Sequence, residues 1–212
     1  MPEGLSIAAT LEREDPRDCF VSLKYKSIED LPIGAIVGSA SVRRKVILQK
    51  MRPDLKIVQF RGNINTRLQK LQNEEVDATI LACAGLIRGE LFNPQYCYPL
   101  EVDQMLPAAG QGVIAIEIRT ENKEMQDICN QINHQATWAL AAAERGLLSY
   151  LDASCRTPLS AYAIFDGDVI KAHYMMSDIT GKNIQYHHEV GDTSTASEMG
   201  VKAAVALSNY TI

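Results

Sequence analysis

Cys155 is placed where a thiol could do chemistry. It lies in the segment Leu151-Asp152-Ala153-Ser154-Cys155-Arg156-Thr157-Pro158, directly after a strongly helical stretch and directly before a predicted strand. Because connectors of this kind run over the protein surface, a thiol on one can be reached, unlike a thiol inside a packed element. The segment therefore predicts a point of covalent attachment.

The remaining four cysteines have a different setting. Each lies in or near an apolar stretch, which predicts a small buried core residue; they are Cys19, Cys83, Cys97 and Cys129. The five cysteines are widely spaced and offer neither a disulfide framework nor paired metal-ligand spacing, so we expect no metal site. This cysteine usage fits a reducing cytoplasm.

Arginines gather after successive predicted strands, and their chemistry suits a polyanion. Arg43 and Arg44 fall in the first turn of a predicted helix, where a cation opposes the helix dipole, so a binding role explains them better than a structural one. Guanidinium groups pair with carboxylates in bidentate fashion, and several in one cleft predict a ligand with many carboxylates. The whole set is Arg43, Arg44, Arg61, Arg67 and Arg88.

The arginine pattern leaves two alternatives open. Each arginine alone could belong to a solvated helix face or to a salt bridge at a rim. A phosphate ligand is the main functional rival, although Gly38, Gly62 and Gly85 are isolated and form neither a phosphate loop nor a dinucleotide-binding motif.

Alternating strands and helices position these residues in the first two-thirds of the chain. This order predicts an α/β unit with a mostly parallel sheet covered on both faces. Ligands bind such sheets at the carboxyl ends of strands, where the Ser, Arg and Gly loops fall. We predict strands at 35–38, 55–60, 77–83 and 113–118, and helices at 42–51, through Leu68 and Leu71, from Gly85, at 122–132 and at 136–150.

A second unit follows a boundary near residue 133. Its pattern predicts a small unit of antiparallel strands and one final helix. The strands are expected at 158–165, 169–176 and 184–190, the turns at 166–168 and 180–182, and the helix at about 196–208.

Composition excludes several classes of partner. The chain has 212 residues, 46 % hydrophobic and 22 % charged, with a net charge of −5. This balance gives no overall attraction to nucleic acid or to an anionic membrane. No window approaches the roughly 18 apolar residues that would span a bilayer, and the first residues do not begin a secretory signal. We therefore expect neither nucleic acid nor membrane as a partner.

Several motifs occur in the order found in one family. They are Val-Gly-Ser-Ala-Ser-Val-Arg-Arg at 37–44, Arg-Gly-Asn-Ile-Asn-Thr-Arg at 61–67, Ala-Gly-Gln-Gly at 109–112 and the Cys155 segment after Ala143-Glu144-Arg145. Glu-Arg-Glu-Asp-Pro-Arg-Asp at 12–18 resembles a further segment. Over essentially its whole length the chain resembles the porphobilinogen deaminase family, also called hydroxymethylbilane synthases.

This resemblance implies a transferase of porphyrin, heme and tetrapyrrole biosynthesis. Members join four porphobilinogen units head to tail into a linear tetrapyrrole, with release of ammonia. Their dipyrromethane cofactor is held by a thioether to a cysteine, which Cys155 matches, with Ala153-Ser154 where the family often has two glycines. Members are usually monomeric. The positions that match carboxylate-binding residues are Ser39, Ser41, Arg43, Arg44, Arg61, Arg67, Arg88 and Gln111.

The resemblance also implies a division into domains. Residues 1–11 and 112–130 match part of domain 1, and 12–111 match an anion-binding domain 2 with a parallel or mixed sheet, like that of periplasmic binding proteins. Residues 134–212 match a smaller α+β domain 3 with a three-stranded antiparallel sheet and the cofactor cysteine. The family's catalytic aspartate aligns a few positions before Met1. We therefore expect the 212-residue chain to be inactive alone, with an apolar strand at 113–118 that favours self-association.

An alternative is a non-catalytic module of periplasmic-binding-protein type that binds a small carboxylate. Cys155 separates the two hypotheses, because a binding module needs no tethered dipyrrole. A gene product without function fits the intact arginine set less well. We expect Trp138 in the core of a helix and His134 at a helix boundary, and we assign no catalytic role to any histidine.

Overall fold

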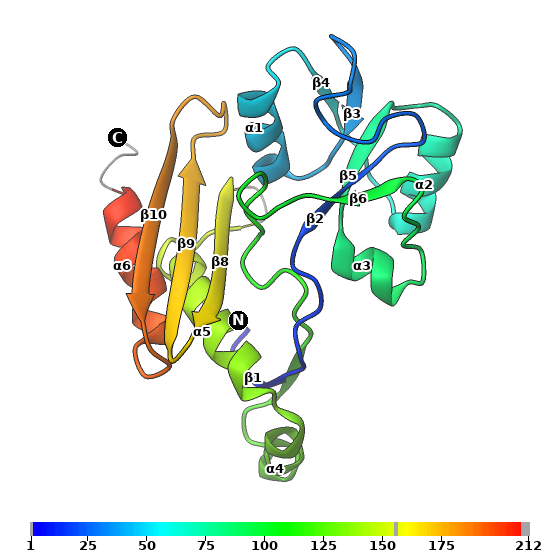
Figure 1. The fold of residues 1–212 in the computed structure, drawn as a ribbon. Helices are drawn as coiled ribbons and strands as arrows, with labels where there is room; N and C mark the ends of the chain where they lie inside the picture. The colour runs from blue at the N-terminus through cyan, green and yellow to red at the C-terminus, as the bar shows by residue number, and fades with distance from the viewer. Residues whose placement is uncertain (1, 155–156, 209–212) are drawn as a thin grey trace.

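Figure 1 shows the fold of the computed structural model, which describes residues 2–154 and 157–208. Its largest sheet has five strands in the order β4-β3-β5-β2-β6. β3 runs parallel to β4 and β5, whereas β2 is antiparallel to β5 and β6, so the sheet is mixed. The strands are β2 (Asp18–Val21), β3 (Ile36–Gly38), β4 (Lys56–Val58), β5 (Ala78–Ala82) and β6 (Cys97–Pro99).

Three helices connect and cover this sheet: α1 (Val42–Met51), α2 (Ile64–Gln72) and α3 (Cys83–Arg88). α1 has the predicted bounds because the Ser41 side chain caps its first turn and Pro53 follows its last. α3 begins at Cys83 rather than at Gly85, which lies inside the helix. Each face of the sheet has its own apolar core, one around Phe20 and Ile80 and the other around Val21 and Leu86. The predicted α/β class is confirmed.

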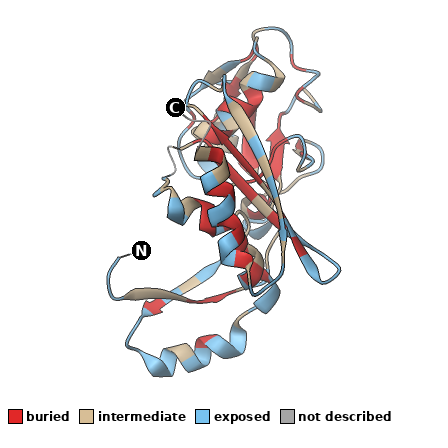
Figure 2. Cartoon of the chain, turned by 90° about the vertical axis from the view of Figure 1, so that its left-hand side faces the viewer, coloured by how far each residue is buried: buried red, intermediate tan, exposed pale blue. Residues whose placement is uncertain are grey.

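A small ribbon joins distant parts of the chain. β1 (Leu5–Thr10) pairs antiparallel with β7 (Ala115–Arg119), and α4 (Lys123–Ile132) packs against both. In Figure 1 this ribbon and α4 extend away from the two larger sheets. Figure 2 shows that α4 is mostly exposed.

The C-terminal part is a three-stranded antiparallel sheet in the order β10-β9-β8, with two helices on one face. The strands are β8 (Leu159–Asp166), β9 (Val169–Ser177) and β10 (Ile184–Gly191), and the helices are α5 (Gln135–Tyr150) and α6 (Ala196–Ser208). Figure 2 shows buried residues along the helix faces that meet the sheet. The predicted antiparallel sheet is confirmed, with strand bounds within one residue of those expected. Its Met175 joins the core of the larger sheet.

The predictions for the four apolar-segment cysteines and for Trp138 have opposite outcomes. Cys19, Cys83, Cys97 and Cys129 are buried and free, as expected. The prediction that Trp138 lies in the core is wrong, because it is 37 % exposed on α5. In the part of the chain that the structure describes, no helix is both long and apolar enough to cross a bilayer.

Candidate functional site

The loops that follow β3, β4 and β5 meet at one edge of the five-stranded sheet. These strands run parallel, so their carboxyl ends lie together. Ser39 follows β3, Arg61 lies beyond the end of β4, and α3 follows β5. Asp18 joins the same edge from the antiparallel β2, where it is paired with Ala82 at the end of β5. The sequence analysis did not place this carboxylate beside the arginines.

Asp18 is the buried anion at the base of this edge. Its side chain is fully buried, and Arg44 donates to Oδ1 through Nη2 at 2.7 Å and Nε at 3.0 Å. Arg43 Nη1 lies 2.7 Å from Oδ2 and forms an ion pair, although the geometry does not give Oδ2 an aligned hydrogen bond. Burial raises the pKa of Asp18, but the two guanidinium charges outweigh it and the net pKa is lowered. Asp18 therefore stays ionised between two cations.

Gln111 completes this network from a distant loop. Its Nε2 donates to the Pro16 carbonyl at 2.6 Å and to Asp18 Oδ1 at 3.1 Å, and its Oε1 accepts from Arg43 Nη2 at 3.3 Å. Arg43 and Arg44 also donate to the carbonyls of Leu106 and Ile80. Arg43, Arg44 and Gln111 thus form the buried base of the site at this edge of the sheet. Two guanidinium groups share one carboxylate there, so this base keeps a net positive charge.

Arg61, Arg67 and Arg88 have no such carboxylate. Arg67 Nε donates to the Gly62 carbonyl at 2.9 Å and Arg88 Nη2 to the Gly112 carbonyl at 3.0 Å. Among the residues described, none of the three has an ion-pair partner. Burial lowers the pKa of Arg67, and the charge of Arg44 lowers it further. This edge of the sheet therefore has more positive than negative charge, which suits an anionic ligand.

Ser39 and Ser41 prepare the start of α1. The Ser41 amide donates to Ser39 Oγ at 3.2 Å, and Ser41 Oγ accepts from the Arg44 amide at 3.4 Å. Ser39 is buried and Ser41 half-buried. Both hydroxyls thus help to set the direction in which Arg43 and Arg44 leave the helix.

Cys155 itself lies outside the described residues, but the residues before it are placed. α5 ends at Tyr150, and Asp152 takes the left-handed backbone conformation with φ 45°. Ala153 has no such φ and donates its amide to the Leu148 carbonyl at 3.0 Å. The alanine that stands in place of a glycine is therefore not forced into a strained conformation.

The structure adds a pair of residues that sequence reasoning missed. Arg13 Nη1 lies 2.5 Å from Glu144 Oε1, and Glu144 also accepts from the amides of Gly110 at 2.6 Å and Ala163 at 2.8 Å. This carboxylate connects the segment before β2, the loop that holds Gln111, and β8. The partners are 131 residues apart, so no local pattern could have indicated the pair.

Family models match nearly the whole chain. One described as porphobilinogen deaminase, dipyromethane cofactor binding domain, matches residues 1–127. Another, described as porphobilinogen deaminase, C-terminal domain, matches residues 138–209. The chain belongs to the porphobilinogen deaminase family. The predicted resemblance, and with it the dipyrromethane cofactor and the transferase class, is confirmed at the level of the family.

Individual relatives agree with this assignment. The porphobilinogen deaminase of Rickettsia canadensis is 55 % identical over 205 residues, which cover 96 % of this chain and 68 % of that protein. The one from Rickettsia akari is 51 % identical over 210 residues, which cover 99 % and 70 %. Among solved structures, a molybdate-binding periplasmic protein of Azotobacter vinelandii has a TM-score of 0.36 at 10 % identity and covers 62 % of both chains.

The arginines at the carboxyl ends of β3, β4 and β5 form a site that we call the arginine edge: Arg43, Arg44, Arg61, Arg67 and Arg88. This site fits the cofactor of porphobilinogen deaminases. Each pyrrole of a dipyrromethane carries an acetate and a propionate, so the group is a polycarboxylate. Arg61, Arg67 and Arg88 keep guanidinium N–H groups that no carboxylate of the described chain occupies. These are the donors that bind carboxylates in bidentate geometry. The described residues contain no group of three or more His, Cys, Asp or Glu side chains that could hold a metal ion.

Proposed function

We propose that this chain supplies the cofactor-attachment and carboxylate-binding residues of a hydroxymethylbilane synthase. In this proposal, Cys155 carries the dipyrromethane through a thioether, and the arginine edge binds the carboxylates of porphobilinogen and of the growing polypyrrole. The observation that supports it most is the unpaired positive charge of Arg67 beside Arg44. The carboxylates of an anionic ligand would pair with this charge, which no carboxylate of the described residues does.

The two groups of arginines have different tasks in this proposal. Arg61, Arg67 and Arg88 bind the ligand carboxylates and orient the rings. Arg43 and Arg44, held by Asp18 and supported by Ser39, Ser41 and Gln111, supply a fixed positive field below them. Because these cations are already ordered by the fold, little further ordering is needed when charge arrives.

Tethering explains how one site can serve repeated condensations. The bound dipyrromethane supplies the primer to which each porphobilinogen is added. A primer held through Cys155 makes each addition effectively intramolecular, which is a large entropic advantage. The task of the chain's own residues is then to hold the acetate and propionate groups while the chain lengthens.

The domain boundaries and the location belong to the same proposal. We assign residues 1–11 and 112–130 to one domain, 12–111 to a second and 134–212 to a third; this division is supported by the three separate sheets. We also propose a cytoplasmic location, since four buried cysteines remain free thiols.

The attachment is tested by mass spectrometry of the denatured protein. The chain is incubated with porphobilinogen or with hydroxymethylbilane and then unfolded. We expect a covalent dipyrrole adduct that peptide mapping places on Cys155, that is absent in Cys155→Ala and that persists in the matched Cys129→Ala. An adduct on another residue, or adduct formation by Cys155→Ala, would show that the attachment point is wrong.

Carboxylate binding is tested separately by calorimetry with pyromellitate, a tetracarboxylate that does not react. Arg67→Gln should weaken binding roughly tenfold or more, the loss expected for one charge-assisted hydrogen bond. Arg119→Gln is the matched control because it removes the same charge from an exposed site on β7. Equal affinities of the two variants would remove the arginine edge from the proposal. If pyromellitate binds but no adduct ever forms, a carboxylate-binding module becomes the better explanation.

A further inference from the structure

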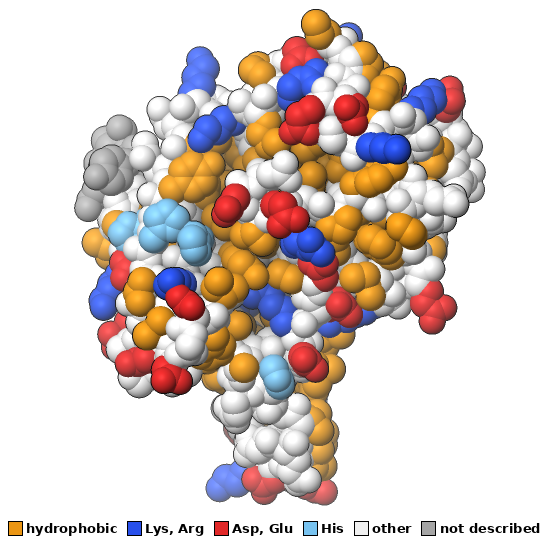
Figure 3. All heavy atoms as spheres, viewed as in Figure 1, with side chains coloured by type: hydrophobic (Ala, Val, Ile, Leu, Met, Phe, Trp, Pro, Cys, Tyr) orange, Lys and Arg blue, Asp and Glu red, His pale blue; other side chains and the backbone are white. Residues whose placement is uncertain are grey.

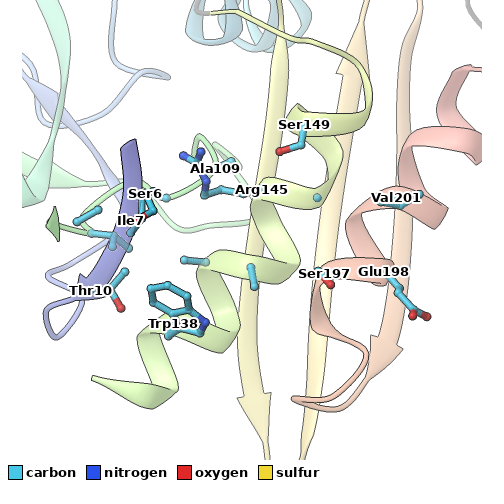
Figure 4. Close-up of a pocket in the computed structure, with 16 residues that line it drawn as sticks. Ser6, Ile7, Thr10, Ala109, Trp138, Arg145, Ser149, Ser197, Glu198 and Val201 are labelled. Carbon is cyan, nitrogen blue, oxygen red and sulfur yellow. The ribbon is translucent and has the colours of Figure 1, made fainter. Parts of the chain in front are cut away.

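A second site, apart from the arginine edge, is formed where the β1–β7 ribbon meets the C-terminal unit. Figure 4 shows this cavity, which has a volume of about 640 Å³. It lies between β1, the loop before β7, α5 and α6. None of the arginines proposed to bind the cofactor lines it. Its size falls in the range of roughly 300–1,000 Å³ that is typical of small-molecule pockets.

The walls of this cavity are mostly apolar. Ile7 on β1, Val113 before β7, Trp138 on α5 and Val201 on α6 contribute to the lining, together with several alanines. Trp138 is more than a third exposed. An apolar or aromatic group could therefore pack against the indole and remove this surface from water.

One cation lines the same cavity. Arg145 on α5 is exposed, and within the described ranges it has no hydrogen-bond or ion-pair partner. Figure 4 shows its side chain extending from α5 toward Ala109. Glu198 also belongs to the lining, but its carboxylate is directed away from the cavity in the same view. The charge presented to an occupant is therefore positive.

We propose that this cavity binds an amphipathic organic anion, with an apolar or aromatic body against Trp138 and Val201 and a single carboxylate or sulfonate on Arg145. An apolar wall with one cation matches a ligand of that kind. It suits a polycarboxylate poorly, since further negative charges would face apolar surface without partners. The site is thus chemically distinct from the arginine edge, and its existence does not depend on the function proposed above.

Anilinonaphthalene sulfonate is a suitable probe because it combines an aromatic body with one negative charge. Trp138 is the only tryptophan in the sequence, so energy transfer from tryptophan reports binding beside it. With the whole chain, we expect saturable one-site binding that quenches Trp138 fluorescence. Naphthoate should compete with the probe, and its neutral methyl ester should compete at least tenfold less well.

Variants of two arginines locate the charge. Arg145→Gln should weaken probe binding roughly tenfold or more, as loss of a charge-assisted hydrogen bond does. Arg119→Gln should leave it unchanged. Ala142→Leu, which fills part of the cavity, should weaken binding without removing the charge. Circular dichroism and thermal unfolding establish that each variant is folded.

Two results would overturn the proposal. Binding of the probe by Arg145→Gln with unchanged affinity, or binding without quenching of Trp138, would mean that the probe occupies another surface. A concentration-dependent dimer in sedimentation experiments that the probe dissociates would mean that a second copy of the chain, rather than a small anion, covers the cavity.

Discussion

Arg13 and Glu144 form a buried ion pair in which Arg13 Nη1 lies 2.5 Å from Glu144 Oε1, with side chains that are 9 % and 0 % exposed. The second Glu144 oxygen accepts from the Gly110 amide, next to Gln111 of the arginine edge. One carboxylate thus connects the N-terminal segment, the loop of the site and the C-terminal sheet. Burial raises the pKa of Glu144, and the charge of Arg13 together with the hydrogen bonds opposes that rise.

Replacement of Glu144 by Gln should destabilise the protein strongly. It leaves the Arg13 guanidinium buried without its anion, a change that typically costs about 3–5 kcal/mol. For a chain of this size the melting temperature should fall by roughly 6–20 °C. Calorimetry measures the shift, with Asp166→Asn as the control, because the Asp166–Lys171 pair is exposed and surface pairs contribute at most about 1 kcal/mol. Equal shifts in the two variants would contradict a stabilising role for the buried pair.

Asp18→Asn should change the dependence of stability on acid pH. The pKa of Asp18 in the folded protein is lowered from its ordinary value of 3.8, because Arg43 and Arg44 outweigh the effect of burial. A carboxyl of this kind stabilises the fold above its unfolded pKa, and this stability is lost as the pH falls through the folded pKa. The free energy of unfolding of the wild type should therefore exceed that of Asp18→Asn at pH 7, with a difference that shrinks below about pH 4.

Urea unfolding from pH 7 to pH 3 measures this difference, with Asp168→Asn in an exposed turn as the control. A gap between wild type and Asp18→Asn that stays constant over the whole range would contradict a depressed pKa for Asp18. The same network predicts that Arg43→Ala weakens the fold as well as ligand binding, because it leaves Asp18 with one cation instead of two.

Local signals explain which elements could be predicted. Ser41 and Pro53 define the ends of α1, and the turn 166–168 places β8 and β9 within one residue of their expected bounds. β2 and β6 are not among the predicted strands. They pair with each other across a large separation in sequence, and no local turn or helix signal bounds them as it bounds β3. β1 depends in the same way on β7, more than a hundred residues later.

The same contrast between local sequence signals and long-range pairing holds for the site. The arginines could be identified because they follow strands whose carboxyl ends share an edge of the sheet. The pairing of Arg43 and Arg44 with Asp18 could not, since nothing in the segment around Asp18 shows which distant cation it faces. Arg88 lies at the end of α3, the helix that follows β5, and its Nη2 donates to the Gly112 carbonyl. Long-range partners, rather than residue types, are what the sequence alone leaves undetermined.

His188→Gln should raise the pKa of His173. The two residues are directly opposite on β9 and β10, with ring centroids 4.5 Å apart, and Figure 3 shows histidines grouped on the surface over this sheet. Burial lowers the pKa of His173 below 6.5, the charges of His188 and Lys171 lower it further, and Asp103 opposes them. Removal of His188 takes away one of these charges.

NMR titration of the imidazole protons measures the change. Because the folded pKa is depressed, the neutral ring stabilises the fold above the unfolded value of 6.5, and this contribution is lost as the pH falls toward the folded pKa. His188→Gln should reduce that loss. His187→Gln is the control, since His187 pairs with Glu189 at 2.6 Å instead of with His173. If both variants leave the His173 titration unchanged, the cross-strand coupling is absent.

Gly200→Ala should push α6 away from α5, the helix that leads into the segment containing Cys155. A Cβ at Gly200 on α6 would lie 2.5 Å from the Ala143 carbonyl oxygen and 2.5 Å from the Leu147 amide nitrogen on α5. Both are backbone atoms that cannot move aside, so we expect a loss of about 1–3 kcal/mol from overpacking. The sign of the change in the free energy of unfolding is informative, because alanine in an unhindered helix position is more favourable than glycine by about 1 kcal/mol.

Denaturant unfolding measures the loss, and Lys202→Ala on the exposed face of α6 is the control with almost no expected effect. The substitution should also affect attachment of the dipyrrole, because α5 leads directly into the segment that contains Cys155. We therefore expect Gly200→Ala to form the dipyrrole adduct more slowly than Lys202→Ala at a temperature where both are folded. A stabilised Gly200→Ala would show that the helices have room to separate, and an unchanged rate of adduct formation would show that their spacing does not position Cys155.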